Sequence, residues 1–211
     1  KAHYNGLIPR NPFIQFHISP TVKEREYLTE DELKAVMTHE FADSKLAYIR
    51  DIFIFASFTA LSFVDIQELT NDNIVEVNGE KWILSKRHKT KVAFQVKLLD
   101  IPLQIVERYR PMQKDNRIFP GLNYWSICKP LKRMIRECGI TKSISFHCSR
   151  HGFATLALSK GMPIESVSRV LGHTNIVTTQ LYAKITTQKL DNDLTMFGDK
   201  LSKTFNGITM S

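Results

Sequence analysis

The sequence predicts a mainly helical α+β fold with a small three-stranded antiparallel sheet. Apolar residues recur at helical spacing over most of the chain, which is typical of amphipathic and buried helices. Three short strand-like runs, at residues 74–77, 81–84 and 92–98, interrupt the helical pattern. Asn78-Gly79 between the first two runs is a strong signal for a two-residue hairpin turn. With 211 residues, the chain is long enough to bury a substantial core.

The first half of the chain begins with a proline-containing stretch, residues 1–22, which favours an extended linker. Thr29 and Glu32 form a predicted capping box for a short helix that reaches about residue 40. The next helix, residues 44–60, is apolar almost all round and is therefore expected to be buried. Arg50 and Asp51 lie inside it. As helix neighbours they should point in different directions, so Arg50 needs another carboxylate or a phosphate as its partner.

Basic residues concentrate in the second predicted hairpin turn and on one later helix. The turn at residues 85–91 has no apolar face to cover, so it is either a solvated turn or a tip that reaches a DNA groove. On the helix at residues 124–138, the basic face is equally consistent with solvent exposure and with phosphate contacts. The candidate DNA-binding residues are Lys86, Arg87, Lys91, Lys129, Lys132 and Arg133.

The remaining helices are predicted from apolar spacing and from glycine and proline at their ends. They cover residues 102–109, 147–159, 163–171 and 175–183, and a further helix lies in the tail after residue 186.

Composition narrows the class of partner. The formal net charge of +8 favours a polyanion, of which nucleic acid is the commonest. The three cysteines lack Cys-x-x-Cys spacing, which argues against a zinc site or disulfide framework and favours a reducing, cytoplasmic setting. No apolar run in the sequence is long enough to span a bilayer. Composition therefore favours either a nucleic-acid-binding protein or a generically basic one, with no membrane span and no zinc site.

The stretch from Phe146 to Tyr182 holds the strongest candidate for chemistry. His147 and Arg150 stand three residues apart, which places them on one face of a helix. The planar guanidinium of Arg150 matches phosphate oxygens. His173 follows a glycine that is expected to end a helix, and Tyr182 is placed in the next helix. A tyrosine hydroxyl attacks a phosphate only when it is oriented and the phosphate charge is neutralised, which these residues would provide.

These motifs, His-x-x-Arg-His, Leu-Gly-His and a tyrosine nine residues later, resemble the signature of the tyrosine recombinase (phage integrase) family. The neighbouring residues most resemble integrases of Bacteroides-type mobile elements. The resemblance implies the catalytic fold of DNA breaking-rejoining enzymes over residues 23–211, including a C-terminal tail helix. Residues 1–22 would then be the linker from a missing N-terminal core-binding domain.

The resemblance also implies roles for individual residues. Tyr182 would attack a phosphate of double-stranded DNA and form a 3′-phosphotyrosyl link, without metal or cofactor. Arg150 and His173 would stabilise the phosphate charge, and His147 would support it or act on the proton of the nucleophile. Lys89, with Lys86 as the second choice, would protonate the leaving 5′-oxygen. The tail would dock on a neighbouring protomer in a tetramer on DNA, or on its own domain.

One position departs from the family pattern. The turn that carries the first catalytic arginine in the family has Ser62 here, while Asp65 fills the carboxylate position that would orient a basic residue. Ser62-x-x-Asp65 also matches a capping box. Arg50 is our preferred substitute arginine, with a structural salt bridge to Asp65 or another acid as its alternative role, and Arg87 is the weaker substitute.

Three other functions remain open at this point. A catalytically silent DNA-binding regulator of the same fold is consistent with Ser62. A type IB topoisomerase would share the chemistry but relax DNA instead of joining two sites. An unrelated phosphodiesterase would release hydrolysed product and hold no covalent DNA.

Overall fold

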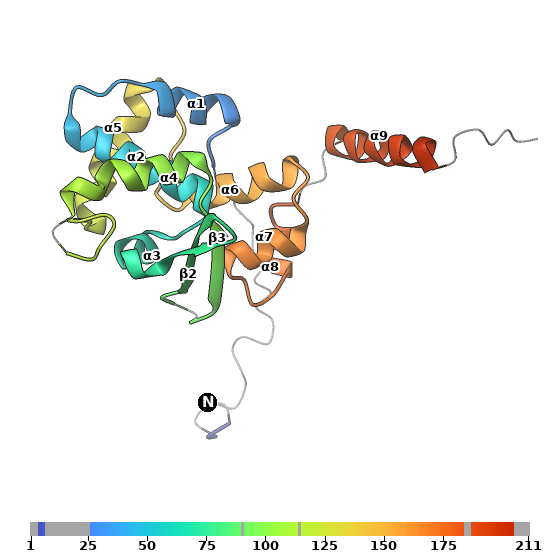
Figure 1. The fold of residues 1–211 in the computed structure, drawn as a ribbon, viewed down its shortest axis with the longest axis horizontal. Helices are drawn as coiled ribbons and strands as arrows, with labels where there is room; N and C mark the ends of the chain where they lie inside the picture. The colour runs from blue at the N-terminus through green and yellow to red at the C-terminus, as the bar shows by residue number, and fades with distance from the viewer. Residues whose placement is uncertain (1–3, 7–25, 90, 114, 184–186, 205–211) are drawn as a thin grey trace, which may run out of the picture.

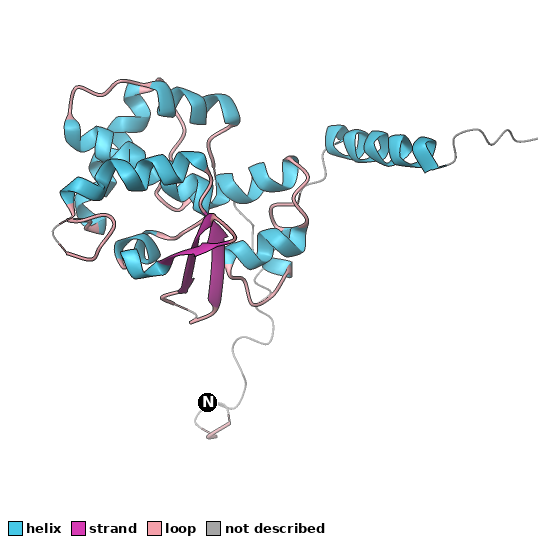
Figure 2. Ribbon diagram, in the orientation of Figure 1, coloured by secondary structure: helices cyan, strands magenta, loops and turns pink. Residues whose placement is uncertain are grey.

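The computed structural model describes residues 4–6, 26–89, 91–113, 115–183 and 187–204. Most of the predicted linker, residues 1–22, lies outside these ranges. The described chain is mainly helical with one three-stranded antiparallel sheet, which confirms the predicted fold class (Figures 1 and 2). Its helices are α1 (Glu30–Thr38), α2 (Ser44–Thr59), α3 (Phe63–Gln67), α4 (Asp100–Tyr109), α5 (Tyr124–Glu137), α6 (Cys148–Ser159), α7 (Ile164–Leu171), α8 (Val177–Gln180) and α9 (Thr187–Thr204).

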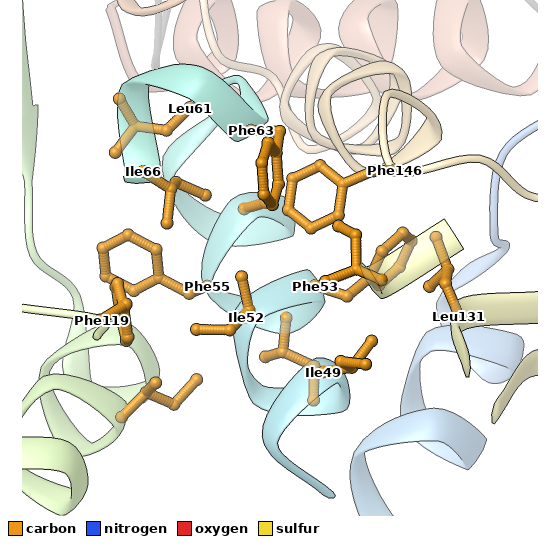
Figure 3. Close-up of a cluster of buried hydrophobic side chains, with 14 of the residues drawn as sticks. Ile49, Ile52, Phe53, Phe55, Leu61, Phe63, Ile66, Phe119, Leu131 and Phe146 are labelled. Atoms are coloured by element: carbon orange, nitrogen blue, oxygen red, sulfur yellow. The ribbon is translucent and has the colours of Figure 1, made fainter. Parts of the chain in front are cut away.

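Helix α2 is the centre of the hydrophobic core. Asp43 caps its first turn by accepting a hydrogen bond from the Lys45 N–H, and the helix ends at Ala60 in a left-handed conformation, φ 56°. Its apolar residues are buried on all sides, as predicted, against α1, α4, α5 and α6. Figure 3 shows the aromatic part of this core, in which Phe53 and Phe63 contact Phe146 in edge-to-face geometry. The core thus fixes the carboxyl end of α2 against the start of α6.

The expectation that Arg50 and Asp51 are poor partners is wrong. The long side chain of Arg50 folds back so that its Nε lies 2.8 Å from Asp51 Oδ1, and its Nη1 donates to the carbonyl of His39. Asp51 also accepts hydrogen bonds from Arg108 and Tyr109, so this buried carboxylate is fully used. Adjacent Cβ atoms of a helix point in different directions, but the arginine side chain is long enough to fold back to its neighbour.

The sheet consists of β1 (Ile74–Val77), β2 (Glu80–Lys86) and β3 (Ala93–Lys97), in the order β1-β2-β3. Asn78 and Gly79 form the predicted tight turn with φ of 54° and 77°. The strand β2 extends two residues further than predicted and pairs Lys86 with Ala93. β3 packs beside α7 (Figure 1). Arg87, at the start of the turn between β2 and β3, donates to the carbonyl of Val170, near the carboxyl end of that helix.

A second, smaller apolar cluster joins the end of α2 to α6 and α7. It contains Ala60, Ala154, Leu158, Val167 and Leu171, and Tyr182 packs against it. Helix α8 is shorter than predicted and ends at Gln180, so Tyr182 lies in the turn that follows instead of inside a helix. The small cluster therefore brings the end of α2, the start of α6, the end of α7 and Tyr182 together.

Helix α9 extends away from the other elements in Figure 1. An apolar stripe along it is exposed, formed by Leu190, Leu194, Phe197 and Leu201. None of the helices in the described ranges is long and apolar enough to cross a membrane.

Candidate active site

The carboxyl end of α7 is the scaffold of the site. Gly172 takes a left-handed conformation, φ 63°, and its N–H donates to Arg169 while the N–H of His173 donates to Ser168. These two bonds form a Schellman motif, which leaves the carbonyls of Val170 and Leu171 without helical partners. Each accepts a hydrogen bond from an arginine instead, Val170 from Arg87 and Leu171 from Arg150. The negative end of the helix thus holds two guanidinium groups next to each other.

Arg150 is buried in the first turn of α6. Its Nη1 donates to the carbonyl of Ala60 at 2.8 Å, and its Nη2 donates to Leu171, so it joins the ends of α2 and α7. Burial and the charge of Arg87 lower the pKa of Arg150 to about 10. Arg150 therefore stays charged at neutral pH in a setting with little water.

Arg87 begins the turn between β2 and β3, with only 5% of its surface exposed. Its Nη1 lies 2.7 Å from Asp65 Oδ2, and its guanidinium carbon lies 4.1 Å from the centre of the Phe94 ring. Its Nε is buried and has no hydrogen-bond partner. Burial lowers the pKa of Arg87, and the Asp65 carboxylate partly opposes that effect. Contrary to our expectation of a solvated or DNA-facing side chain, Arg87 turns inward.

Asp65 connects the turn after α2 to this arginine. Its Oδ2 accepts hydrogen bonds from Arg87 and from the hydroxyl and N–H of Ser62, while its Oδ1 accepts one from the N–H of His88. Burial acts to raise the pKa of Asp65, but the bonds from His88, Arg87 and Ser62 together lower it. The predicted capping box of Ser62 and Asp65 is present. The same carboxylate therefore caps α3 and holds Arg87.

His173 lies directly after Gly172 and is half-buried. Its Nδ1 lies 2.8 Å from the hydroxyl oxygen of the buried Thr179. Burial and the nearby charges of Arg150, Arg87 and His147 lower the pKa of His173 to about 4. The imidazole is therefore neutral at physiological pH.

Tyr182 completes the cluster. Its ring centroid lies 5.1 Å from that of His151, and the ring of His151 contacts that of His147 edge-on at 4.6 Å. The ionised form of Tyr182 raises the pKa of Arg150, so the phenolate and the guanidinium are electrostatically coupled. His147 precedes α6 and is exposed. The structure thus brings together Tyr182, Arg150, His173 and His147, with Asp65 and Arg87 alongside.

Arg50 does not join this group. Its bonds to Asp51 and to the His39 carbonyl hold it near the start of α2, whereas the site lies beyond the other end of that helix, at Ala60. At 1.5 Å per residue, ten helical residues separate the two positions by roughly 15 Å. The hypotheses that Arg50 supplies the missing charge or pairs with Asp65 are therefore not supported, because Arg87 occupies that place.

The remaining basic candidates are mostly exposed. Lys86, Lys89 and Lys91 surround the turn that starts at Arg87, and Lys129 and Lys132 lie on α5. Arg133 is exposed on α5 but pairs with Glu137 and Asp43, which competes with a phosphate contact. Of these candidates, the three lysines of the hairpin turn lie nearest in sequence to the buried Arg87.

Sequence reasoning missed two parts of the site. The hydrogen bond between Thr179 and His173 had no local signal beyond the spacing of six residues. The close approach of Arg87 to Gly172 was also missed: a Cβ at Gly172 would lie 2.9 Å from Arg87 Nε and 3.0 Å from its Cγ. The glycine of Leu-Gly-His was interpreted only as a helix end, but it also makes room for this side chain.

Comparison with known sequences agrees with the motifs. Residues 26–189 match the Phage integrase family. Tyrosine recombinase XerA from Pyrococcus horikoshii is 32% identical over 177 residues, which cover 77% of this chain and 58% of that protein. Tyrosine recombinase XerD from Listeria innocua is 26% identical over 207 residues, which cover 89% of this chain and 67% of that protein. The chain thus spans between about half and two thirds of these relatives.

Solved structures show the same fold. The Tn1549 transposon integrase in complex with a circular intermediate DNA matches with a TM-score of 0.76 at 17% identity, over 92% of this chain and 74% of that one. The XerH site-specific recombinase in its post-cleavage complex matches with a TM-score of 0.69 at 22% identity, over 86% of this chain and 56% of that one. At such low identity these similarities concern the arrangement of elements alone.

Proposed function

Because the chain belongs to the tyrosine recombinase (phage integrase) family, we propose that it breaks and rejoins DNA with Tyr182 as the nucleophile. The observation that carries this proposal is that Tyr182 packs against α6, the helix that holds Arg150, while Arg150 and Arg87 bind adjacent carbonyls just before His173. Preorganised cations in a water-poor site stabilise the charge that develops on a phosphate during attack.

In the proposed reaction, the phenolic oxygen of Tyr182 forms a bond to the phosphorus of a DNA phosphodiester. The bond from phosphorus to the 5′-oxygen breaks, which leaves a 3′-phosphotyrosyl link and a free 5′-hydroxyl. His147 takes the proton of the tyrosine, and Lys89 gives a proton to the leaving oxygen. The phosphodiester energy is retained in the new link, so a 5′-hydroxyl from a second DNA end can reverse the step.

We further propose that Arg87 supplies the charge that Ser62 cannot. Its contact with Asp65 and its donation to the carbonyl next to the one that Arg150 binds support this assignment. The hydroxyl of Ser62 donates to the same oxygen of that carboxylate, Oδ2. An arginine from the β2–β3 turn therefore reaches the partner that an arginine at position 62 would use.

The substrate is proposed to be double-stranded DNA within a site-specific recombination reaction of a mobile element. The similarity in fold to the Tn1549 integrase and in sequence to Xer recombinases supports site-specific recombination. The residues around the motifs resemble those of integrases from Bacteroides-type mobile elements, and this resemblance supports a mobile element of the Bacteroides type. Exposed lysines at positions 86, 91, 129 and 132 are the proposed phosphate contacts.

Self-association on DNA is proposed to use α9. Its exposed stripe of Leu190, Leu194, Phe197 and Leu201 suits docking on a second copy of this chain. A tetramer would bring two DNA sites together with four copies of the candidate active site.

One observation favours a second function. Ser62 in place of an arginine is what a catalytically silent DNA-binding regulator of this fold would tolerate. Such a protein would bind DNA without forming a covalent link.

Covalent trapping tests the proposal. A pool of nicked duplexes with randomised sequence around the nick releases, on cleavage, the short fragment that bears the free 5′-hydroxyl. Without that hydroxyl the step cannot reverse, so the phosphotyrosyl link persists and is read by gel shift and sequencing. We expect an adduct with the wild-type chain and none with Tyr182→Phe, although both bind DNA. Arg87→Ala is expected to slow trapping by about 10²-fold or more.

Arg50→Ala is the matched control, since it removes a half-buried guanidinium outside the cluster. It is expected to cleave near the wild-type rate when circular dichroism shows a folded protein. Wild-type cleavage by Arg87→Ala, or loss of cleavage in folded Arg50→Ala, would contradict the assignment of Arg87. DNA binding without any adduct, in wild type and Tyr182→Phe alike, would favour the silent regulator.

A further inference from the structure

Thr179 is the closest side-chain partner of His173, and it has no access to solvent. Its exposed fraction is 0%, and its Oγ1 lies 2.8 Å from His173 Nδ1. The backbone of Thr179 is already used: its N–H donates to Ile176 and its carbonyl accepts from the N–H of Tyr182 at 3.0 Å. The residue therefore contacts His173 through its side chain and Tyr182 through its backbone.

The burial of this hydroxyl restricts where its hydrogen can go. A threonine hydroxyl donates one hydrogen bond, and a buried donor needs an acceptor because no water replaces it. The nitrogen Nδ1 is the acceptor in contact. If Nδ1 instead carried a hydrogen and donated it to Oγ1, the hydrogen of the threonine would need another acceptor in a site without solvent.

The positive charges around His173 also oppose a second proton on its ring. The groups that face it are Arg150 and Arg87 from α6 and the β2–β3 turn, and His147 from the start of α6. Burial of the ring and these charges together disfavour a second proton, and they lower the pKa of His173 to about 4. A neutral imidazole has one hydrogen, on either Nδ1 or Nε2.

We propose that Thr179 is a positioning residue whose hydroxyl donates to Nδ1 and so fixes the single hydrogen of His173 on Nε2. Resting on the proposed function, Nε2–H is then the group that donates to the DNA phosphate. His173 contributes a hydrogen bond, not a full charge, and the two arginines carry the charge. Thr179 thereby fixes the tautomer of His173 through its side chain and the turn that holds Tyr182 through its backbone.

The test compares three substitutions. Thr179→Val keeps the shape and the backbone bonds but removes the hydroxyl, while Thr179→Ser keeps the hydroxyl. Thr178→Val makes the same chemical change at the exposed neighbouring position. The first readout is the ¹⁵N spectrum of the histidine rings at neutral pH, with His173 assigned by its absence in His173→Gln.

We expect the hydrogen on Nε2 in wild type, Thr179→Ser and Thr178→Val, and a mixture of tautomers in Thr179→Val. In single-turnover trapping on the nicked pool, Thr179→Val should be slower by about tenfold with unchanged DNA affinity. Thr179→Ser should recover most of the rate.

A wild-type ring with its hydrogen on Nδ1, or a Thr179→Val ring that keeps the wild-type tautomer, would overturn the proposal. The spectrum needs no DNA cleavage. A chain that shows the expected tautomers but never forms an adduct would therefore refute the proposed function and leave the hydrogen bond of Thr179 upheld.

Discussion

Gly172 lies where the backbone after α7 meets the side chain of Arg87. Its left-handed conformation ends the helix, and its lack of a Cβ lets the arginine pass within contact distance. The requirement for glycine is thus steric as well as conformational. This distinction is measurable, because Gly161 also has positive φ, 88°, but nothing lies within 4 Å of its Cβ position.

Gly172→Ala is expected to destabilise the fold by more than Gly161→Ala does. Both substitutions place alanine at positive φ, which costs about 1 kcal/mol. Only Gly172→Ala also pushes against Arg87 Nε and Cγ, which is expected to add about 1–3 kcal/mol of overpacking. Urea denaturation measures both free energies of unfolding, and equal losses would mean that Arg87 moves aside without cost.

Asp65→Asn is expected to cost about 3 kcal/mol at neutral pH, because it leaves the buried guanidinium of Arg87 without a charged partner. The pKa of Asp65 is lowered in the folded state. Its stabilisation is therefore complete above the unfolded-state value of about 4 and is lost as pH falls through the folded-state pKa.

Urea denaturation of wild type and Asp65→Asn over a series of pH values checks this. The difference in free energy of unfolding should shrink below pH of about 4. Asp72→Asn, at an exposed carboxylate in the same half of the chain, provides the control. A pH-independent difference would show that the charge of Asp65 is not what holds Arg87.

The turn between β2 and β3 joins two proposed roles in six residues. Within this turn, the N–H of Arg87 donates to the Val92 carbonyl, and the N–H of Lys91 donates to the Arg87 carbonyl. These bonds, and the contact of Arg87 with Asp65, fix one end of the turn. Lys89 is exposed at its tip.

Lys89→Ala is expected to slow cleavage of ordinary DNA by about 10²-fold, the usual contribution of a general acid. A substrate with sulfur in place of the bridging 5′-oxygen has a leaving group that needs no proton, so the variant should cleave it near the wild-type rate. Lys86→Ala and Lys91→Ala are the controls in the same assay. Rescue of Lys86→Ala instead would move the role of acid to Lys86.

Much of the architecture follows from local patterns. The capping boxes at Thr29 and Ser62, the Asn78-Gly79 turn and the buried helix α2 were predicted, because each depends on residues within a few positions. The choice of arginine was not. Arg87 reaches Asp65 across 22 positions of sequence, a tertiary contact that no local pattern predicts.

The placement of Tyr182 shows the same limit. Apolar spacing predicted one helix through residue 183, but the α-helix ends at Gln180 and turn-type hydrogen bonds follow it. The packing of Tyr182 on the small cluster around Ala154 and the bond from its N–H to Thr179 favour a turn. Tertiary contacts thus decided the conformation of the residue that matters most.

At the scale of the molecule, the apolar stripe on α9 is not covered by any other part of the chain that the structure describes. Leu194 and Phe197 are 59% and 57% exposed. Substituting them removes nothing from the core, so effects on assembly are separable from effects on folding.

The double substitution Leu194→Glu with Phe197→Glu is expected to abolish higher-order complexes on DNA, because docking would bury both charges. The melting temperature should change little. Sedimentation of the protein with a duplex measures the assembly, and Thr195→Glu, off the stripe on the same helix, is the control. Unchanged complexes in the double variant would mean that α9 does not join protomers.

The shared carboxylate of Asp65 has a consequence for how such chains diverge. Ser62 and Arg87 both bind its Oδ2, so an arginine at position 62 and one at position 87 would compete for one anion. A lineage that moves the guanidinium from one position to the other must pass through a chain with two arginines and crowded like charges, or with neither. The two positions are therefore expected to change together among descendants, as a substitution pair that neither site tolerates alone.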